Sequence, residues 1–401
     1  MNALFSEMQR SVAANNIDAW VLYDMRHSND LAWNILQLDP DAHCTRRWMV
    51  IVPAKGRPVK ITHRMEQNPL SHLDIESVVY DTRDSWESTV QRHLAPFKQV
   101  AMEYSPMGRL PVISKVDAGI VELIRSHGVE VVSSADILQE FTSVLSEEQI
   151  AGACLAAGQL RETVMDAFGF IRKTIERKGH VSEFDIQSFI MAEFQRKGLT
   201  TDSAPIVAIG PNAASPHYAP TRLVTSDIGP DMVVLIDAWC RHDAPGSVFA
   251  DITWVGYTAE VVPDDIEASF AIIRRGRDAA LQLVRDRFAS VTPLSGFEVD
   301  RACRDVIDAS GMGHAFIHRT GHNITTQVHG PGANMDDFET QDTRRVLPGT
   351  SFSIEPGMYI PNVLGLRTEI DVIITHDQQV LVPSEPIQQR VLPLMSQDWS
   401  A

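Results

Sequence analysis

The sequence of 401 residues has little cysteine and no long apolar run. Its four cysteines, Cys44, Cys154, Cys240 and Cys303, are far apart and form no Cys-x-x-Cys pair. This spacing indicates free thiols in a reducing compartment rather than a disulfide scaffold. No apolar run approaches the roughly 20 residues that span a bilayer, and the first residues lack the basic and apolar regions of a signal peptide.

An excess of basic residues is also lacking, since the formal net charge is -17. Unspecific binding to nucleic acid or to an anionic membrane surface favours a basic patch, so neither partner is expected. Hydrophobic residues make up 44% and charged residues 22% of the chain, and no low-complexity tract stands out. This composition is typical of a soluble globular protein, and we expect a cytoplasmic one.

The length favours two domains, which we predict at 1–142 and 143–401. The first part alternates helix-like and strand-like segments and predicts a small α/β domain. A helix is expected up to about residue 16. Strands are expected at 19–23, 48–52, 59–62 and 129–132.

The second part starts with a change of character near Ser143. Ser146 and Gln149 form a potential capping box, which predicts the start of a long amphipathic helix. Helices are expected at 146–178, 182–197, 264–287 and 297–309, with strands from about residue 206 and over the last 80 or so residues. This order predicts an α+β domain in which helices flank an antiparallel sheet.

Two aspartates lie in apolar segments that read as strands. Asp237 is in the segment 232–239 and Asp251 in 249–255, and the loop at 242–246 allows the chain to return as a hairpin. The two carboxylates would then repel each other unless a cation lies between them. The simpler interpretation is that both aspartates are solvated at strand ends or turns, as most acidic residues are.

Two glutamates repeat the pattern, since Glu355 and Glu369 are 14 positions apart, as are the two aspartates. A carboxylate in a buried strand must be paired, hydrogen-bonded or bound to a metal. Pro356-Gly357 predicts a bend directly after Glu355. Four acidic residues suit a hard divalent ion, and a histidine would shift the preference toward transition metals. For Glu369, the competing interpretation is a salt bridge to Arg367, two positions away.

Histidines at 314, 318 and 322 are spaced by four, which would place them on one face of a helix. Glycines at 311, 313 and 321 argue against a helix here. We therefore expect strand and loop, with His322 as the metal ligand. For His314 and His376 a structural role is the better interpretation.

In this order, these residues resemble the pita-bread superfamily, which includes aminopeptidase P, prolidase, methionine aminopeptidase and the metal-free creatinase. The matching motifs are Leu-Ile-Asp-Ala around Asp237, Ala-Asp-Ile-Thr around Asp251, Thr-Gly-His ending at His322, Ile-Glu-Pro-Gly around Glu355 and Arg-Thr-Glu ending at Glu369. The resemblance implies a centre of two metal ions, with Asp251 and Glu369 bridging both. Asp237 would bind one ion, and His322 and Glu355 the other.

The resemblance extends to the whole layout, because the Xaa-Pro branch and creatinase carry a smaller N-terminal α/β domain. It implies that His217 and His329 are histidines of the substrate pocket, and that the protein is a homodimer. For His217 and for His329, a structural role is the alternative. The chain departs from the family in three places: the 14 positions between the aspartates imply a longer loop at 242–248, and Asn323 and Thr325 replace glycines.

The favoured hypothesis is hydrolysis of a peptide bond that precedes proline in a small peptide. Two divalent ions, Mn, Co, Zn or Fe, would activate a water. Glu355 would serve as general base, and His217 and His329 would hydrogen-bond the substrate and the developing oxyanion. Arg367 would orient Glu369 or receive a substrate carboxylate.

Two other hypotheses stay open from the sequence. One keeps the fold and changes the reaction, to a creatinase-like or ectoine-type hydrolase or a metal-dependent lyase acting on a small molecule. The altered loop at 242–248 keeps this second hypothesis open. The other is a non-catalytic binding protein, for which a complete set of metal ligands is not needed.

Overall fold

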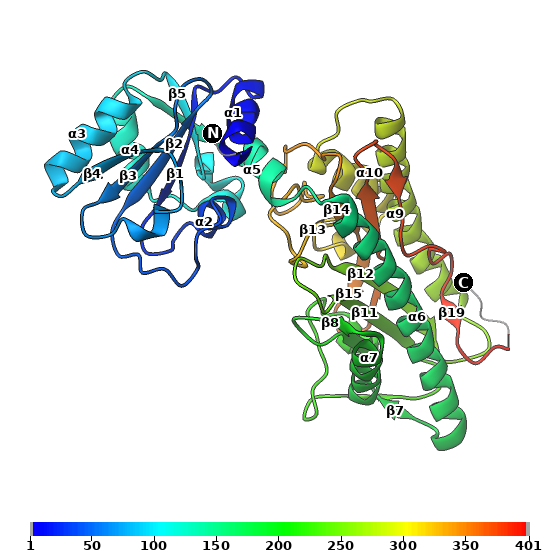
Figure 1. Ribbon diagram of the computed structural model, residues 1–401. Coiled ribbons are helices and arrows are strands. Elements are labelled where there is room, and N and C mark those ends of the chain that lie inside the picture. Colours follow the sequence, from blue (N-terminus) through cyan, green and yellow to red (C-terminus); the bar gives the residue numbers. More distant parts are fainter. Residues whose placement is uncertain (1–2, 398–401) are drawn as a thin grey trace. The chain divides into compact units, whose positions relative to one another are not determined.

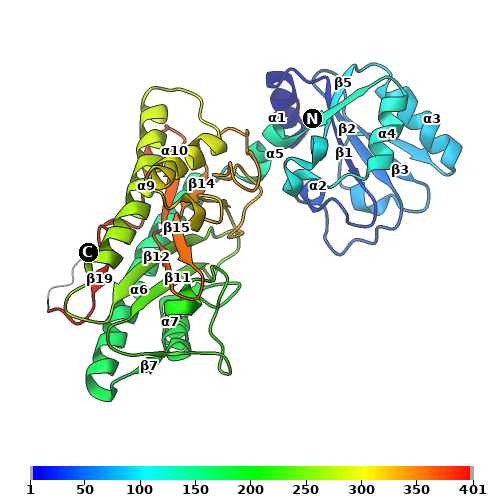
Figure 2. The same ribbon diagram turned by 180° about the vertical axis from the view of Figure 1, so that it is seen from behind.

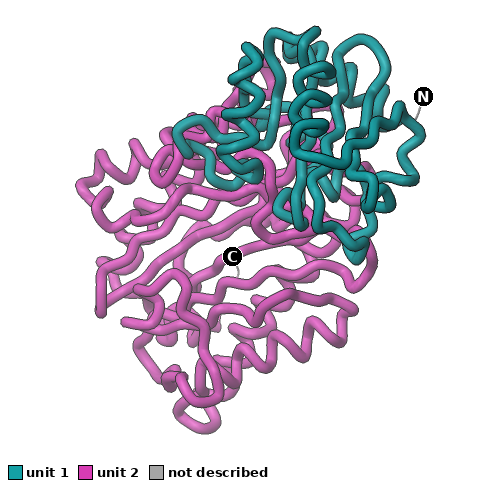
Figure 3. Tube along the Cα trace, turned by 90° about the vertical axis from the view of Figure 1, so that its left-hand side faces the viewer, with its two compact units in different colours: residues 1–142 teal, residues 143–401 magenta. Residues whose placement is uncertain are grey.

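The protein is described here from a computed structural model, in which residues 3–397 are placed (Figure 1). The chain divides into two compact units, Met1–Thr142 and Ser143–Ala401, which Figure 3 colours separately. Within residues 3–397, no helix is both long and apolar enough to cross a membrane.

Unit 1 is built on a mixed sheet with the strand order β4-β3-β2-β1-β5-β6. Its strands are β1 (Ala19–Asp24), β2 (Trp48–Pro53), β3 (Val59–His63), β4 (Glu76–Tyr80), β5 (Gln99–Met102) and β6 (Glu130–Ser133). Its helices are α1 (Ala3–Ala14), α2 (Asp30–Ile35), α3 (Arg83–Leu94), α4 (Ala118–Ser126) and α5 (Ala135–Thr142), with short 3-10 turns η1 (Asn68–Leu70), η2 (Pro106–Gly108) and η3 (Pro111–Ile113). The four strands predicted in this region are confirmed within one residue.

The central strands β1 and β2 are buried on both faces, because helices cover both sides of the sheet. Successive side chains of a strand point to opposite faces. Trp20 and Leu22 accordingly pack in the core with α1, α2 and α5. Val21 and Tyr23 pack in the core with α3 and α4. The α/β character of unit 1 follows from these continuous apolar runs.

A buried carboxylate lies in the core of unit 1. Glu103 is fully buried, and it accepts hydrogen bonds from Trp20 Nε1 (2.7 Å), Asn29 Nδ2 (2.8 Å) and Ser134 Oγ (3.0 Å). Burial raises the pKa of Glu103, and these three hydrogen bonds act in the opposite direction. The raised pKa means that folded unit 1 holds a proton on Glu103 more tightly than the unfolded chain does.

This carboxylate predicts a pH dependence of stability. Because the folded pKa is raised, the unfolding free energy of unit 1 should fall as the pH rises from the ordinary glutamate value through the raised one. Glu103→Gln should flatten this dependence, since glutamine does not titrate. Urea unfolding at several pH values, followed by tryptophan fluorescence, measures it, because four of the seven tryptophans are at 20, 33, 48 and 86. An unchanged pH slope in the variant would contradict the assignment.

Unit 2 contains long helices and short antiparallel ladders. Its helices are α6 (Glu147–Lys178), α7 (Glu183–Lys197), α8 (Gly210–Ala213), α9 (Asp264–Ala289) and α10 (Gly296–Ala309), with the 3-10 turn η4 (Gly313–Ala315). Its strands are β7 (Val181–Ser182), β8 (Leu199–Thr200), β9 (Ile206–Ile209), β10 (Asp227–Ile228), β11 (Val233–His242), β12 (Ala250–Tyr257), β13 (Asn323–Ile324), β14 (Ser351–Ile354), β15 (Gly357–Ile360), β16 (Leu364–Arg367), β17 (Ile370–Ile374), β18 (Val380–Leu381) and β19 (Leu392–Pro393). The four predicted helices are confirmed within two residues, as is the capping box of Ser146 and Gln149.

The long strands β11 and β12 form the centre of unit 2. They pair antiparallel, so the predicted hairpin is confirmed, and a second ladder runs in the order β13-β14-β17-β18. Figures 1 and 2 show α6 and α7 on one side of these strands and α9 and α10 on the other. Two buried cores correspond to the two sides: Ile236 and Ile252 pack with α6 and α7, whereas Leu235 and Val255 pack with α9 and α10.

Candidate metal centre

Asp237 and Asp251 lie on the same face of the β11–β12 pair. In the register of this pair Asp237 is opposite Thr253, and Asp251 is opposite Trp239. The two aspartates are therefore diagonal neighbours, whose side chains are within reach of each other. The adjacent Ile236 packs in the core with α6 and α7. Because successive side chains of a strand point to opposite faces, both carboxylates lie on the other face of the pair.

Glu355 and Glu369 lie at two facing interruptions of the strands, not inside continuous strands as the sequence suggested. Glu355 comes between β14 and β15, and Glu369 between β16 and β17. Ile354 pairs with Ile370 before the interruption, and Gly357 pairs with Arg367 after it. The Pro356-Gly357 bend predicted from the sequence lies at this point. The two glutamates are thus placed opposite each other by the ladders on either side.

Three predicted ligands converge in the structure. Asp251, His322 and Glu369 are buried, and one ligand atom from each lies within 4.8 Å of the others. Nε2 of His322 is 3.7 Å from Oδ2 of Asp251 and 3.5 Å from Oε1 of Glu355. Glu355 thus lies beside the cluster, and Asp237 lies next to it on β11. All five predicted ligands are therefore in one buried region.

The imidazole of His322 is oriented for ligation. Its Nδ1 is 3.3 Å from the carbonyl oxygen of Asn323, so that a proton on Nδ1 leaves the lone pair of Nε2 directed at the carboxylates. Burial lowers the pKa of His322 well below its ordinary value, and the charges of His329 and Arg319 lower it further. A neutral imidazole with a free Nε2 is the form that binds a metal.

The carboxylates show the cost of crowding acidic groups in a buried space. Burial raises the pKa of Asp251 well above its ordinary value, and the charges of Glu369 and Asp237 raise it further. The pKa of Glu369 is raised in the same way, first by burial and then by Glu355. Among the described residues, Oδ1 of Asp251 has no hydrogen-bond partner. Divalent cations fit this donor set, because they would neutralise the carboxylate charges and bind the unpartnered Oδ1 of Asp251.

Neighbouring residues contact the predicted ligands Asp251 and Glu369. The hydroxyl of Thr253 donates to Oε2 of Glu369 (2.7 Å), and Oδ2 of Asp371 accepts from the backbone N–H of Asp251 (2.9 Å). Both Thr253 and Asp371 are buried, and burial raises the pKa of Asp371 to about 8. Such contacts fix ligand orientation in metal sites.

Arg367 has a different partner from the predicted one. Its guanidinium forms an ion pair with Asp237 and donates to the hydroxyls of Thr253 (3.0 Å) and Tyr359 (2.9 Å). The expected ion pair with Glu369 does not form among residues 3–397. Both side chains instead bond to the hydroxyl of Thr253, which accepts from Arg367 and donates to Glu369. Arg367 is 3% exposed, so its contacts favour holding Asp237 over receiving a substrate carboxylate.

Two residues of the site were missed by the sequence analysis. Nε2 of His318 lies 2.8 Å from the hydroxyl of Tyr359, and that hydroxyl also accepts from Arg367. Burial lowers the pKa of His318 to about 3, and the charge of Arg367 contributes. The spacing of four between His318 and His322 is the one signal in the sequence, but it implies proximity only on a helix, and the glycines at 311, 313 and 321 argue against a helix here.

His217 and His329 lie on the solvent side of the cluster. The ring of His329 is 4.3 Å from that of His322, centroid to centroid, at an angle of 63°. Burial lowers the pKa of His329, and the charges of Arg319 and His217 lower it further. His217 is exposed, in the loop between α8 and β10. The structure thus brings both histidines to the region of the five carboxylate and imidazole groups.

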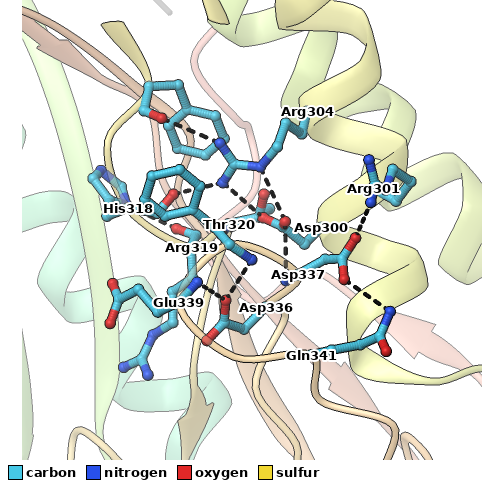
Figure 4. A network of polar contacts seen from close by, with 12 residues as sticks. Asp300, Arg301, Arg304, His318, Arg319, Thr320, Asp336, Asp337, Glu339 and Gln341 are labelled. Atoms are coloured by element: carbon cyan, nitrogen blue, oxygen red, sulfur yellow. Dashed lines mark hydrogen bonds and ion pairs between the residues drawn. The ribbon is translucent and has the colours of Figure 1, made fainter. Parts of the chain in front are cut away.

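A buried ion pair on α10 supports the segment that carries the histidines (Figure 4). Asp300 is fully buried, pairs with Arg304 (3.1 Å), and accepts hydrogen bonds from the backbone N–H groups of Thr320 (2.8 Å) and Asp337 (3.1 Å). Arg304 in turn donates to the carbonyl oxygen of His318 (2.7 Å). The residues between His318 and His322 are therefore held from both their N–H and their C=O groups.

Asn323, one of the departures from the family, is buried behind His322. Its Nδ2 donates to the carbonyl oxygen of Ser351 (2.9 Å), and its Oδ1 accepts from the N–H of Gly332 (2.9 Å). A Cβ on Gly330 or Gly332 would come within 2.4 to 2.7 Å of the Asn323 side chain. The larger residue at 323 is therefore accommodated by glycines across from it, away from the carboxylates.

The model of metallopeptidase family M24 matches residues 148–376, and the chain belongs to this family. A probable dipeptidase PepE of Mycobacterium bovis is 27% identical over 358 residues, which cover 86% of this chain and 85% of the relative. An Xaa-Pro dipeptidase of Lactobacillus helveticus is 31% identical over 214 residues, 52% of this chain and 51% of the relative. The protein is thus a metallopeptidase of a metal-dependent family.

Solved structures show the fold. The crystal structure of dipeptidase PepE from Mycobacterium ulcerans matches with a TM-score of 0.67 and 20% identity, covering 97% of both chains. The prolidase from Pyrococcus horikoshii OT3 matches with a TM-score of 0.60 and 18% identity, covering 97% of this chain and 100% of the other. The predicted α+β architecture, a pita-bread domain with a smaller N-terminal α/β domain, is confirmed.

Proposed function

We propose that this metallopeptidase binds two divalent ions and cleaves peptide bonds next to proline in small peptides. The observation that carries the proposal is the buried convergence of Asp251, His322 and Glu369, with Asp237 and Glu355 beside them. Relatives support the substrate class, because several are named Xaa-Pro dipeptidase or Xaa-Pro aminopeptidase.

The five ligands would divide between the ions as the family resemblance implies. Asp251 and Glu369 would contact both, which suits their closeness to each other and to His322 and the unpartnered Oδ1 of Asp251. Such ions, when bound, act as Lewis acids and lower the pKa of water. Mn, Co, Zn and Fe all accept carboxylate and imidazole ligands.

Other side chains of the site would manage the substrate. Glu355 has Oε1 3.5 Å from Nε2 of His322 and accepts from the hydroxyl of Ser353 (3.2 Å), so it is held at the edge of the cluster and can take a proton from water as general base. His217 and His329 lie on the solvent side, where they can donate hydrogen bonds to the scissile carbonyl and its oxyanion.

The proposal is tested by metal analysis of chelator-free protein together with a panel of peptides. We expect two metal ions per chain and cleavage of Ala-Pro or of an Xaa-Pro tripeptide, with little turnover of the matched Ala-Ala peptides. Treatment with a chelator should abolish cleavage, and added Mn²⁺, Co²⁺, Zn²⁺ or Fe²⁺ should restore it.

The panel also separates the competing functions. Bound metal without cleavage of any peptide would overturn the peptidase proposal and favour a hydrolase or lyase for a small molecule. Equal cleavage of Ala-Pro and Ala-Ala would keep the peptidase and remove the preference for proline.

A further inference from the structure

The segment 210–226, here called the His217 loop, is long and carries an exposed histidine. Its ends are anchored in the sheets, because Ile209 of β9 pairs with β11 and Asp227 of β10 pairs with β7. Between these anchors the loop contains α8 and the exposed residues Arg222 and Leu223. A catalytic histidine on such a loop needs support, because small displacements of a reacting group reduce rates strongly.

A single carboxylate provides contacts along the whole loop. Glu183, in the first turn of α7, is fully buried. Its Oε1 accepts from the backbone N–H of Ile209 (2.9 Å) and from Nδ2 of Asn212 (3.0 Å). Its Oε2 accepts from the hydroxyl of Tyr218 (2.6 Å) and the backbone N–H of Ser226 (2.8 Å). Glu183 thus binds the start, the middle and the end of the loop.

The position of Tyr218 makes this arrangement relevant to the site, since Tyr218 follows His217 directly. The loop before it is a series of turns, with N–H groups of Ser215 and Tyr218 bonded to the carbonyl oxygens of Asn212 and Ser215. Fixing Asn212 and Tyr218 on one carboxylate therefore restricts the backbone on both sides of His217.

A second contact brings the loop close to the strands of the metal centre. A Cβ on Gly365 of β16 would lie 1.7 Å from the carbonyl oxygen of Ala213, so α8 rests directly on the backbone of this strand. Arg367, the partner of Asp237, lies two residues further along β16. The His217 loop is thus held between α7 and the strand that leads to the metal centre.

We infer that Glu183 is a positioning residue for the peptidase reaction: it clamps the His217 loop so that His217 is held over the metal centre. This inference rests on the proposed function for its catalytic consequence. The clamp itself depends on the contacts of Glu183 alone. A carboxylate suits this role because its two oxygens accept from four donors, whereas a glutamine would present an NH₂ group to two of them.

The test compares Glu183→Gln with Asp185→Asn, which removes the same charge from an exposed side chain in the same turn of α7. We expect Glu183→Gln to lower kcat/KM for the best Xaa-Pro peptide by about 10- to 100-fold with unchanged metal content. The control should stay within about twofold. Tyr218→Phe, which removes one hydrogen bond, should lose about fivefold and serves if Glu183→Gln folds poorly.

A double-mutant cycle with His217→Asn distinguishes positioning from general stabilisation. If Glu183 acts through His217, Glu183→Gln should cause little further loss in the His217→Asn background. Fully additive losses, or wild-type kcat/KM in Glu183→Gln, would overturn the inference. A parallel loss of metal and activity would also overturn it, since Glu183 would then support the metal centre itself.

Limited proteolysis measures how firmly the His217 loop is held, and it does not depend on peptidase activity. Arg222 is exposed in the loop, so trypsin should cut after it faster in Glu183→Gln and Tyr218→Phe than in the wild type or Asp185→Asn. Equal cleavage rates would overturn the clamp even if the protein is an active peptidase. Faster cleavage in a protein that hydrolyses no peptide would support the clamp and refute only the proposed function.

Discussion

Asp251→Asn protein should bind divalent metal far more weakly than the wild type and lose about 10³-fold or more in kcat/KM. Ligand atoms of Asp251, His322 and Glu369 lie within 4.8 Å of one another, so loss of the Asp251 carboxylate affects the whole cluster. Removal of Lewis-acid stabilisation costs several kcal/mol, and each ~1.4 kcal/mol changes the rate about tenfold. Calorimetric titration with Mn²⁺ and peptide kinetics measure the two losses.

A matched control comes from the same hairpin. Asp243 is exposed in the turn between β11 and β12, so Asp243→Asn removes the same charge and should leave metal binding and activity near wild type. The metal-free Asp251→Asn protein should melt no lower than the metal-free wild type, because a repelling buried carboxylate has been removed. Wild-type metal affinity in Asp251→Asn would refute its role as a ligand.

Asp300→Ala should lower the free energy of opening of α10 by about 3–5 kcal/mol, the cost of breaking a buried ion pair from one side. Arg304 is 8% exposed and would keep its charge without the carboxylate. Its Cζ lies 4.3 Å from the ring centroid of Phe316 and 4.4 Å from that of Phe338. The backbone N–H of Thr320 would also lose its acceptor. Native-state hydrogen exchange of α10, followed by mass spectrometry, gives the opening free energy directly.

The neighbouring Arg301 provides the comparison for Asp300. It forms an ion pair with Asp337 from an exposed position on the same helix. Arg301→Ala should therefore change stability by less than about 1 kcal/mol. Because Asp300 and Arg304 hold the segment from His318 to His322, Asp300→Ala should also weaken metal binding, and Arg301→Ala should not. If Asp300→Ala and Arg301→Ala lowered the opening free energy equally, the buried Asp300–Arg304 pair would contribute no more to stability than the exposed Arg301–Asp337 pair.

Much of the fold and the composition of the site could be predicted, because these features depend on local patterns. Apolar periodicity and the capping box of Ser146 gave the long helices. The turn between two apolar segments predicted the hairpin that brings Asp237 beside Asp251. Charged residues in otherwise apolar runs identified Glu355 and Glu369 as groups that need a partner.

The partners of individual side chains could not be predicted, because they depend on distant parts of the chain. Arg367 and Glu369 are two positions apart, yet Arg367 pairs with Asp237, which is 130 positions away. The contacts of Glu183 span 26 to 43 positions, and nothing in the sequence around Glu183 distinguishes it from the other acidic residues of its helix. His318 lies in a loop, where spacing carries no information about direction.

The facing interruptions at Glu355 and Glu369 bear on how this enzyme can be altered. Paired strands flank both carboxylates, with the pair Ile354–Ile370 on one side and the pair Gly357–Arg367 on the other. A residue inserted next to either carboxylate would shift the pairing and turn a predicted ligand away. The tip of the β15–β16 hairpin, at 361–363, is exposed and lies beyond the last pair. The length of the chain can therefore change at this tip while the geometry of the two carboxylates is preserved.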